Sequence, residues 1–245
     1  MADRHERRTR HAAAALAAQL PLLVEPAASH GRGTLSHLIA AAEALTSAIG
    51  SPTRTTPMSL SQLLISWQDC TSQRSAAICQ VAHGCNEAVL RERANSAVNA
   101  AHDSLSADQL PMSVTTFVGP ARLDDFMAGL TISLGKLAQR CGAQLEAASR
   151  QQALRALALA LEERYPGHTI ELRVPPVTAV QLGAFGQGPS HHRGTPPNVV
   201  ETDPDTFWAL CLGQLAWDQA RAEHQLRVSG AHADEVARML PVIKH

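Results

Sequence analysis

The spacing of the apolar residues changes partway along the chain, and this change constrains the fold more than any other feature. Apolar side chains first recur at the three- and four-residue intervals of one helix face, at Leu35, Leu38, Ile39, Ala42, Leu45 and Ile49. At 169–174 they alternate with polar residues, as in a half-buried strand, and a second strand-like run follows at 177–182. The sequence therefore predicts a helical domain followed by a domain of mixed structure.

Residues 1–147 predict an antiparallel helical bundle. Besides the helix near 33–49, helical patterns occupy about 59–82 and 86–105. Pro120 suits the first turn of another long helix. The apolar face of that helix is Leu123, Met127, Leu130, Leu134 and Leu137. Several helices joined by short connections are typical of a bundle.

Residues 148–245 predict an α+β domain, which makes the chain α+β overall. Strands are expected at about 169–174, 177–182, 198–201 and 225–228. Helices are expected at 153–164, after Asp203, near 217–223 and at 234–240. Asp203 and Pro204 suit an N-cap and a first-turn proline. Because strands and helices do not alternate regularly, we expect an α+β domain without regular βαβ units.

Charge and composition exclude several classes of protein. The 245 residues carry a net charge of −1, so the chain lacks the basic excess of a nucleic-acid-binding protein. No apolar run approaches the ~18–20 residues that a membrane span needs. The Ala- and Leu-rich stretch near the start follows Asp3 and Glu6, unlike a signal peptide, so we expect a cytoplasmic protein.

The reactive side chains form no recognisable catalytic motif. The five cysteines are spread along the chain without a C-x-x-C pair, unlike a disulfide framework or a zinc site. The acidic pairs Asp124–Asp125 and Glu162–Glu163 are expected on solvated helix faces, because adjacent helical residues point about 100° apart. We therefore predict no catalytic residue, no metal site and no cofactor.

The C-terminal part resembles the sterol-carrier-protein domains. Residues 203–243 read DPDTFWALCLGQLAWDQARAEHQLRVSGAHADEVARMLPVI, with an acidic-led helix, G-x-L, an Ala-centred helix, L-x-V-S-G and a last helix ending M-L-P. The runs RVPP at 173–176 and RGTPPNVVE at 193–201 resemble the actinobacterial branch of that family. Those proteins carry an N-terminal bundle of the DinB/mycothiol-dependent maleylpyruvate isomerase type. The runs GTLSHLIA at 33–40 and GPARLDD at 119–125 resemble its second and fourth helices.

The resemblance implies a divalent-metal site whose ligands are replaced here. Enzymes of that family hold the metal with a His from helix two and an acid-x-x-x-His pair on helix four, because residues four apart share a helix face. Matched through the surrounding motifs, these positions hold Ala41, Gly129 and Ser133. Without ligands such a site cannot activate a metal-bound water or thiolate. We therefore expect the metal-dependent chemistry to be absent, and His37 to be a satisfied or surface residue.

Two groups of residues are candidates for ligand binding. The loop residues His191, His192 and Arg193 suit an anionic group, since Arg offers a rigid fork of donors, and a solvated loop is the alternative. The lipid-carrier resemblance implies an apolar tunnel between sheet and helices, and ordinary core filling is the alternative there. The residues in question are Phe207, Trp208, Trp217 and Met239.

The leading hypothesis is a non-catalytic two-domain protein whose C-terminal domain binds a lipid or another small apolar ligand. One alternative is a mycothiol- or other thiol-dependent isomerase or transferase acting in the interdomain cleft, with Arg193 and its neighbouring histidines meeting an anionic cosubstrate. Another is a protein-interaction module. The sequence indicates no particular oligomeric state.

Overall fold

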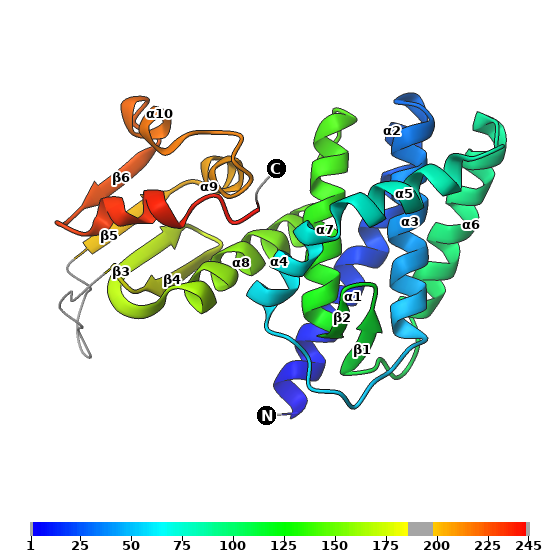
Figure 1. Ribbon diagram of the computed structural model, residues 1–245, viewed down its shortest axis with the longest axis horizontal. Helices are drawn as coiled ribbons and strands as arrows, with labels where there is room; N and C mark the ends of the chain where they lie inside the picture. The colour runs from blue at the N-terminus through cyan, green and yellow to red at the C-terminus, as the bar shows by residue number, and fades with distance from the viewer. Residues whose placement is uncertain (1, 186–197, 244–245) are drawn as a thin grey trace. The chain divides into compact units, whose positions relative to one another are not determined.

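The computed structural model describes residues 2–185 and 198–243, and its contacts divide the chain into two compact units, residues 1–153 and 154–245. The first unit is helical and the second contains a sheet (Figure 1). The expected fold class, a helical bundle followed by an α+β domain, is confirmed. No helix in the described ranges is both long and apolar enough to cross a membrane.

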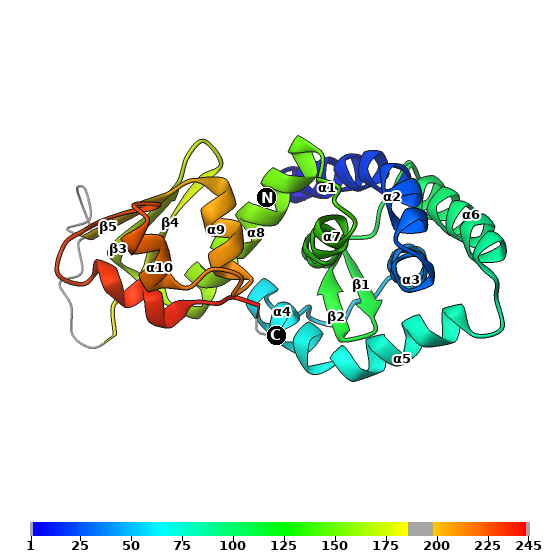
Figure 2. The same ribbon diagram turned by 90° about the horizontal axis from the view of Figure 1, so that it is seen from above.

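Helices and one short hairpin build the first unit. The helices are α1 (Ala2–Leu22), α2 (Val24–Ser29), α3 (Arg32–Ile49), α4 (Leu60–Asp69), α5 (Thr71–Ala82), α6 (Glu87–Leu105), α7 (Leu123–Arg140) and the first turns of α8 (Ala147–Arg164). The hairpin pairs β1 (Ser113–Thr116) with β2 (Gly119–Arg122). Figure 2 looks along α3 and α7, with α5 lying across α3 rather than alongside it.

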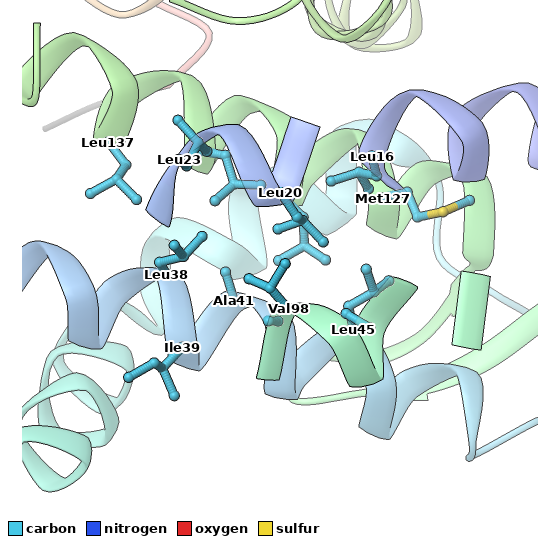
Figure 3. Packing of buried hydrophobic residues seen from close by; sticks show 14 of the residues in the cluster. Leu16, Leu20, Leu23, Leu38, Ile39, Ala41, Leu45, Val98, Met127 and Leu137 are labelled. Atoms are coloured by element: carbon cyan, nitrogen blue, oxygen red, sulfur yellow. The ribbon is translucent and has the colours of Figure 1, made fainter. Parts of the chain in front are cut away.

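The apolar stripe expected on α3 forms the centre of the bundle core. Leu35, Leu38, Ile39 and Leu45 are fully or almost fully buried. Their cluster includes partners from three other helices (Figure 3), among them Leu16, Leu20, Val98, Met127 and Leu137. Each buried aliphatic side chain stabilises the fold by roughly 1.5–3 kcal/mol relative to an exposed one.

Two helix boundaries differ from the sequence-based prediction. The helix expected at 59–82 is interrupted at Cys70, where α4 ends and α5 begins. Pro120 does not open a helix but lies in β2 opposite Thr115, and the helix begins at Leu123. Gly119, with a φ of 123°, reverses the chain into the hairpin. An edge strand of this kind tolerates a proline.

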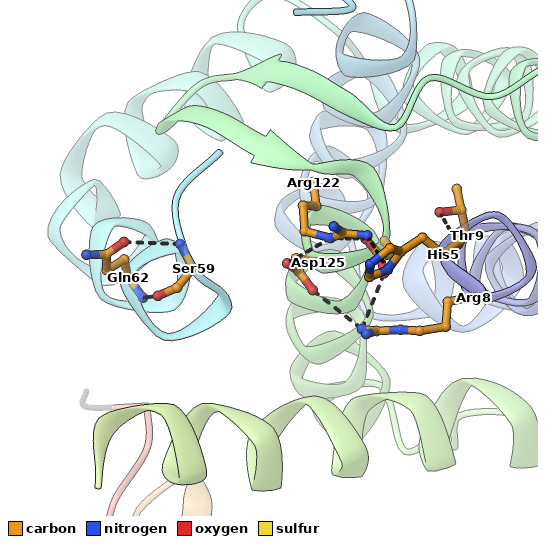
Figure 4. A network of polar contacts seen from close by, with 8 residues as sticks. His5, Arg8, Thr9, Ser59, Gln62, Arg122 and Asp125 are labelled. Carbon is orange, nitrogen blue, oxygen red and sulfur yellow. Dashed lines mark hydrogen bonds and ion pairs between the residues drawn. The ribbon is translucent and has the colours of Figure 1, made fainter. Parts of the chain in front are cut away.

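The acidic pair at the start of α7 is buried, which corrects the expectation of a solvated face. Asp124 lies 3.3 Å from the Arg8 guanidinium and 3.2 Å from that of Arg122. Asp125 lies 3.7 Å from Arg8, and Arg122 also contacts His5 (Figure 4). Buried carboxylates are costly without partners, so the two arginines compensate for the lost solvation. The network joins the beginning of α1 to the beginning of α7.

The second unit is built on a four-stranded sheet in the order β4-β3-β5-β6. Its strands are β3 (Pro166–Val174), β4 (Thr178–Leu182), β5 (Asn198–Thr202) and β6 (Leu226–Ser229). β3 and β5 are parallel, and the other neighbours are antiparallel. The remaining elements are the end of α8, α9 (Pro204–Cys211), α10 (Trp217–Ala222) and η1 (Ala233–Met239). η1 is a 3₁₀ helix where an α-helix was expected, a form common in short segments.

Asp203 caps α9, as the sequence predicts. Its Oδ1 accepts hydrogen bonds from the backbone N–H groups of Asp205 (2.9 Å) and Thr206 (3.0 Å). Its Oδ2 accepts one from the Thr206 hydroxyl (2.6 Å). Burial alone would raise the pKa of Asp203, but these hydrogen bonds outweigh burial and lower it.

We predict that Asp203→Ala lowers the free energy of unfolding by about 1 kcal/mol at neutral pH, because the α9 cap is lost. Asp203→Asn is the matched control, since Asn caps as well as Asp. Folding lowers the pKa of Asp203 below the ordinary aspartate value. The negative charge of Asp203 therefore stabilises the folded state fully at pH values above the ordinary pKa, and this stabilisation is lost as the pH falls through the lower pKa of the folded state. Urea unfolding followed by circular dichroism at several pH values checks both points. Equal losses in the Ala and Asn variants at neutral pH would contradict the capping role.

Candidate functional site

Three of the four described C-terminal residues that were expected to bind a ligand lie in packed surroundings. Phe207, Trp208 and Met239 are only 1%, 7% and 2% exposed. Phe207 and Trp208 come from α9, and Met239 ends η1. Such burial is what core filling requires, so contact of these side chains with a ligand stays a prediction. The described residues do not include His191, His192 and Arg193.

Trp217 lies at an open hollow on the second unit. The hollow has a volume of about 360 Å³ and is also lined by Asp218, Arg221, Asp234 and Ala237. The Trp217 indole N–H donates to Asp234 (3.2 Å), which also pairs with Arg221 (3.1 Å). Three polar groups of this hollow, those of Trp217, Arg221 and Asp234, therefore already bind one another.

The three positions that the resemblance matches to metal ligands lie on two contacting helices of the first unit. Ala41 comes from α3, whereas Gly129 and Ser133 lie one turn apart on α7. Ala41 and Ser133 line a cavity of about 210 Å³, together with His37. We call this apolar hollow of the bundle the inner cavity.

Small side chains open the inner cavity. Ala40, Ala41 and Ala44 of α3 and Ala77 of α5 form one side, which we call the alanine wall. Helix α5 crosses α3 (Figure 2). Methyl groups at these four positions leave space that longer side chains would fill. Larger apolar side chains complete the lining, namely Trp67, Ile78, Phe117 and Leu130.

The ring of Trp67 packs directly against the backbone of α7 at Gly129. A Cβ on residue 129 would lie 2.9 Å from Cζ3 and 3.1 Å from Cε3 of this ring. Real Cβ atoms essentially never approach so closely, so any other residue at 129 would force the indole to shift. The position that the resemblance assigns to an acidic ligand is therefore covered by an aromatic ring.

Three aromatic rings pack edge-to-face or tilted against one another at this end of the cavity. The centroid of Trp67 lies 4.9 Å from that of Phe117 and 5.4 Å from that of Phe126. Phe126 is fully buried, whereas Phe117, in the turn of the β1–β2 hairpin, is 44% exposed. Phe117 therefore faces both the inner cavity and solvent.

His37 and Ser133 provide the polar side chains of the lining. The His37 Nε2 lies 3.0 Å from the Ser133 Oγ, across the space between α3 and α7. The histidine is thus satisfied by a hydroxyl, in agreement with the expectation from sequence. The other described lining residues are aliphatic or aromatic.

These residues do not fit a metal ion. Ala41 offers a methyl group, Gly129 has no side chain, and the Ser133 hydroxyl is hydrogen-bonded to the imidazole of His37. The indole of Trp67 fills the space beside Gly129. A transition-metal site needs several N, O or S donors. Residues 2–185 and 198–243 contain no group of three or more His, Cys, Asp and Glu side chains that could hold an ion.

Two cysteines are unsuited to nucleophilic chemistry at neutral pH. Burial raises the pKa of Cys211 strongly, and burial also raises the pKa of Cys141 against the opposing charge of Arg140. The reactive species of a cysteine is the thiolate, so both side chains remain protonated and inert.

Trp67 and the members of the alanine wall other than Ala41 are site residues that sequence reasoning missed. One signal was available: Ala40, Ala41 and Ala44 replace the larger apolar residues that a core-facing helix usually carries. Which residues line the inner cavity depends on the crossing of α5 over α3 and on the close packing of the Trp67 ring against Gly129. Neither is readable from spacing alone.

We predict that Gly129→Ala destabilises the protein by roughly 1–3 kcal/mol, because the new methyl group displaces the Trp67 ring. Gly33→Ala on α3 is the control, since a Cβ there meets nothing within 4 Å in the described structure. That control should be neutral or stabilising by about 0.5–1 kcal/mol, because alanine favours helix. Urea unfolding and the Trp emission spectrum measure both effects. A Gly129→Ala variant as stable as Gly33→Ala would contradict the tight contact.

Comparison with known proteins supports the expected resemblance. Residues 146–242 match the model of a family described as bacterial SCP ortholog. A histidine-to-alanine variant of the mycothiol-dependent maleylpyruvate isomerase has a similar structure, with a TM-score of 0.50, 16% sequence identity and 92% of each chain covered. Another structure of that isomerase gives a TM-score of 0.46 at 15% identity, again over 92% of each chain. A search of curated protein sequences found no match. The chain thus combines a C-terminal region that matches the bacterial SCP ortholog model with a fold similar to that of the mycothiol-dependent maleylpyruvate isomerase.

Proposed function

We propose that the protein is a non-catalytic binding protein for a small apolar molecule, and that the inner cavity of the bundle holds this molecule without a metal. The observation that carries the proposal is the alanine-walled cavity of about 210 Å³ at the positions matched to metal ligands. Its polar side chains, His37 and Ser133, already bind each other. An apolar ligand therefore displaces no hydrogen bond when it enters.

The size and lining of the cavity suit a ligand somewhat larger than benzene. An engineered apolar cavity of about 150 Å³ in another protein stays dry and binds benzene. Apolar pockets favour transfer of an apolar ligand from water by roughly 25 cal/mol per Å² of buried surface. Phe117, half exposed in the hairpin turn, lies where such a ligand would enter.

A metal-independent thiol-dependent isomerase is the second candidate. Its support is the fold shared with the mycothiol-dependent maleylpyruvate isomerase. Ala41, Gly129 and Ser133 count against it, because they offer no replacement for a metal's charge. Turnover of maleylpyruvate in the presence of mycothiol, by protein freed of metal, would favour this candidate over a binding role.

Lipid binding by the second unit is a further possibility that the SCP match supports. The burial of Phe207, Trp208 and Met239 argues against a ready-made tunnel beside them. The bundle cavity needs no such rearrangement, so we place the ligand there. A cytoplasmic location remains a prediction from the sequence.

Bromobenzene tests the proposal, because its bromine quenches an indole on contact and Trp67 lines the cavity. We expect saturable quenching in the wild type. Ala77→Leu, which fills the alanine wall from α5, should weaken binding at least about tenfold, or ~1.4 kcal/mol. Ala76→Leu is the matched control, since Ala76 is equally on the exposed part of α5 but is not among the described lining residues. Leucine is a good helix former, so both variants should fold.

Either of two results would refute this assignment. Quenching that never saturates in the wild type would mean that the cavity holds no apolar ligand. Saturable quenching that survives Ala77→Leu unchanged would place the ligand elsewhere.

A further inference from the structure

A second hollow of different chemistry adjoins the inner cavity. This outer hollow has a volume of about 410 Å³ and lies among α3, α5 and α6. Ala40, Ala44 and Ala77 line both hollows, so the two adjoin at the alanine wall. No long side chain projects from these three positions to separate them. A ligand longer than the inner cavity would pass between these methyl groups to reach the outer hollow.

The lining changes from apolar to polar along this path. The outer hollow is bordered by Glu43 and Ser47 of α3, Gln80 of α5 and Arg93 of α6. All four side chains carry hydrogen-bonding groups, and Ser47 and Gln80 are exposed. The site as a whole thus has an apolar interior and a polar mouth, a pattern complementary to an amphipathic molecule.

The charges at the polar mouth balance each other. Arg93 Nη2 donates to Glu43 Oε1 at 2.9 Å, and Arg93 Nη1 lies 3.4 Å from the Val81 carbonyl oxygen. An anionic head group would have to compete with the Glu43 carboxylate for the guanidinium, and would lie close to that like charge. A cationic head group would have to compete with the Arg93 guanidinium for the Glu43 carboxylate, and would lie close to that like charge. An uncharged group that both donates and accepts can bind Arg93 and Glu43 without separating them.

We infer that the ligand is an uncharged amphiphile, such as a medium-chain alcohol or amide, with its apolar body in the inner cavity and its polar head between Glu43 and Arg93. This inference rests on the proposed function, since it assumes that the inner cavity binds an apolar group. It adds the head-group class and the residues that select it.

Two octyl compounds with bromine at the chain end test the selection, one ending in a hydroxyl and the other in a carboxylate. Binding is measured at neutral pH by saturable quenching of the tryptophan emission, and Ala77→Leu defines the part that depends on the cavity beside Trp67. In the wild type the alcohol should bind at least about tenfold more tightly than the carboxylate, equivalent to ~1.4 kcal/mol. Glu43→Gln should strengthen carboxylate binding relative to alcohol binding and so reduce the ratio of the two affinities, because Arg93 then lacks a competing anionic partner.

The control is a second ion pair of the same kind on the bundle. Glu25 of α2 pairs with Arg91 of α6, two residues before Arg93, and neither borders the hollows. Glu25→Gln removes one carboxylate, as Glu43→Gln does, and should keep the wild-type preference for the alcohol.

The outcomes separate this inference from the function on which it rests. If bromobenzene fails to bind saturably, the proposed function is wrong. If bromobenzene binds but the two octyl compounds bind equally, or Glu43→Gln leaves their ratio unchanged, the head-group inference is overturned and the binding function stands. Alcohol binding that persists in Ala77→Leu would also overturn it.

Discussion

The contact between the Trp67 ring and the backbone of Gly129 is the constraint on which the site depends. Any side chain at residue 129 would occupy the space of the ring, because a Cβ there would lie 2.9 Å from the indole. The indole of Trp67 lines the inner cavity, packs against Phe126 in the core and makes an edge-to-face contact with Phe117 at the solvent side. Because Gly129 has no side chain, the ring of Trp67 covers the position that the resemblance matches to an acidic metal ligand. His37 and Ser133, the polar side chains of the cavity lining, are hydrogen-bonded to each other, so the rest of the lining is apolar.

Much of the fold was predictable from the sequence because local signals and packing agree. The stripe from Leu35 to Leu45 has helical period, and the same residues are buried in α3. Asp203 and Pro204 predict the beginning of α9, and Asp203 does cap it. Alternation at 169–174 predicts a strand, and the inward residues Ile170, Leu172 and Val174 of β3 are buried. The resemblance located Ala41, Gly129 and Ser133, and the structure brings α3 and α7 together around them.

The remaining features depend on contacts between distant segments, which spacing does not encode. Asp124 and Asp125 look like surface residues locally, but Arg8, more than a hundred positions away, allows their burial. Pro120 carries the signature of a helix start, yet pairing of β2 with β1 overrides it. The cavity itself is a property of two crossing helices with alanines at their contact, and the pairing of Glu43 with Arg93 is visible only once α3 and α6 are placed. In the second unit, Phe207 and Trp208, which suggested a ligand tunnel, are packed like core residues.

The central claim is that the bundle has exchanged a metal site for an apolar binding site. Its most direct test is the metal content of the protein purified without chelator and dialysed after exposure to excess zinc or nickel. The account predicts no stoichiometric metal, because Ala41, Gly129 and Ser133 provide a single weak donor and the indole of Trp67 covers the space beside Gly129. One tightly held ion per chain, lost on His37→Ala or Ser133→Ala, would contradict it and restore a metal-dependent role for the bundle.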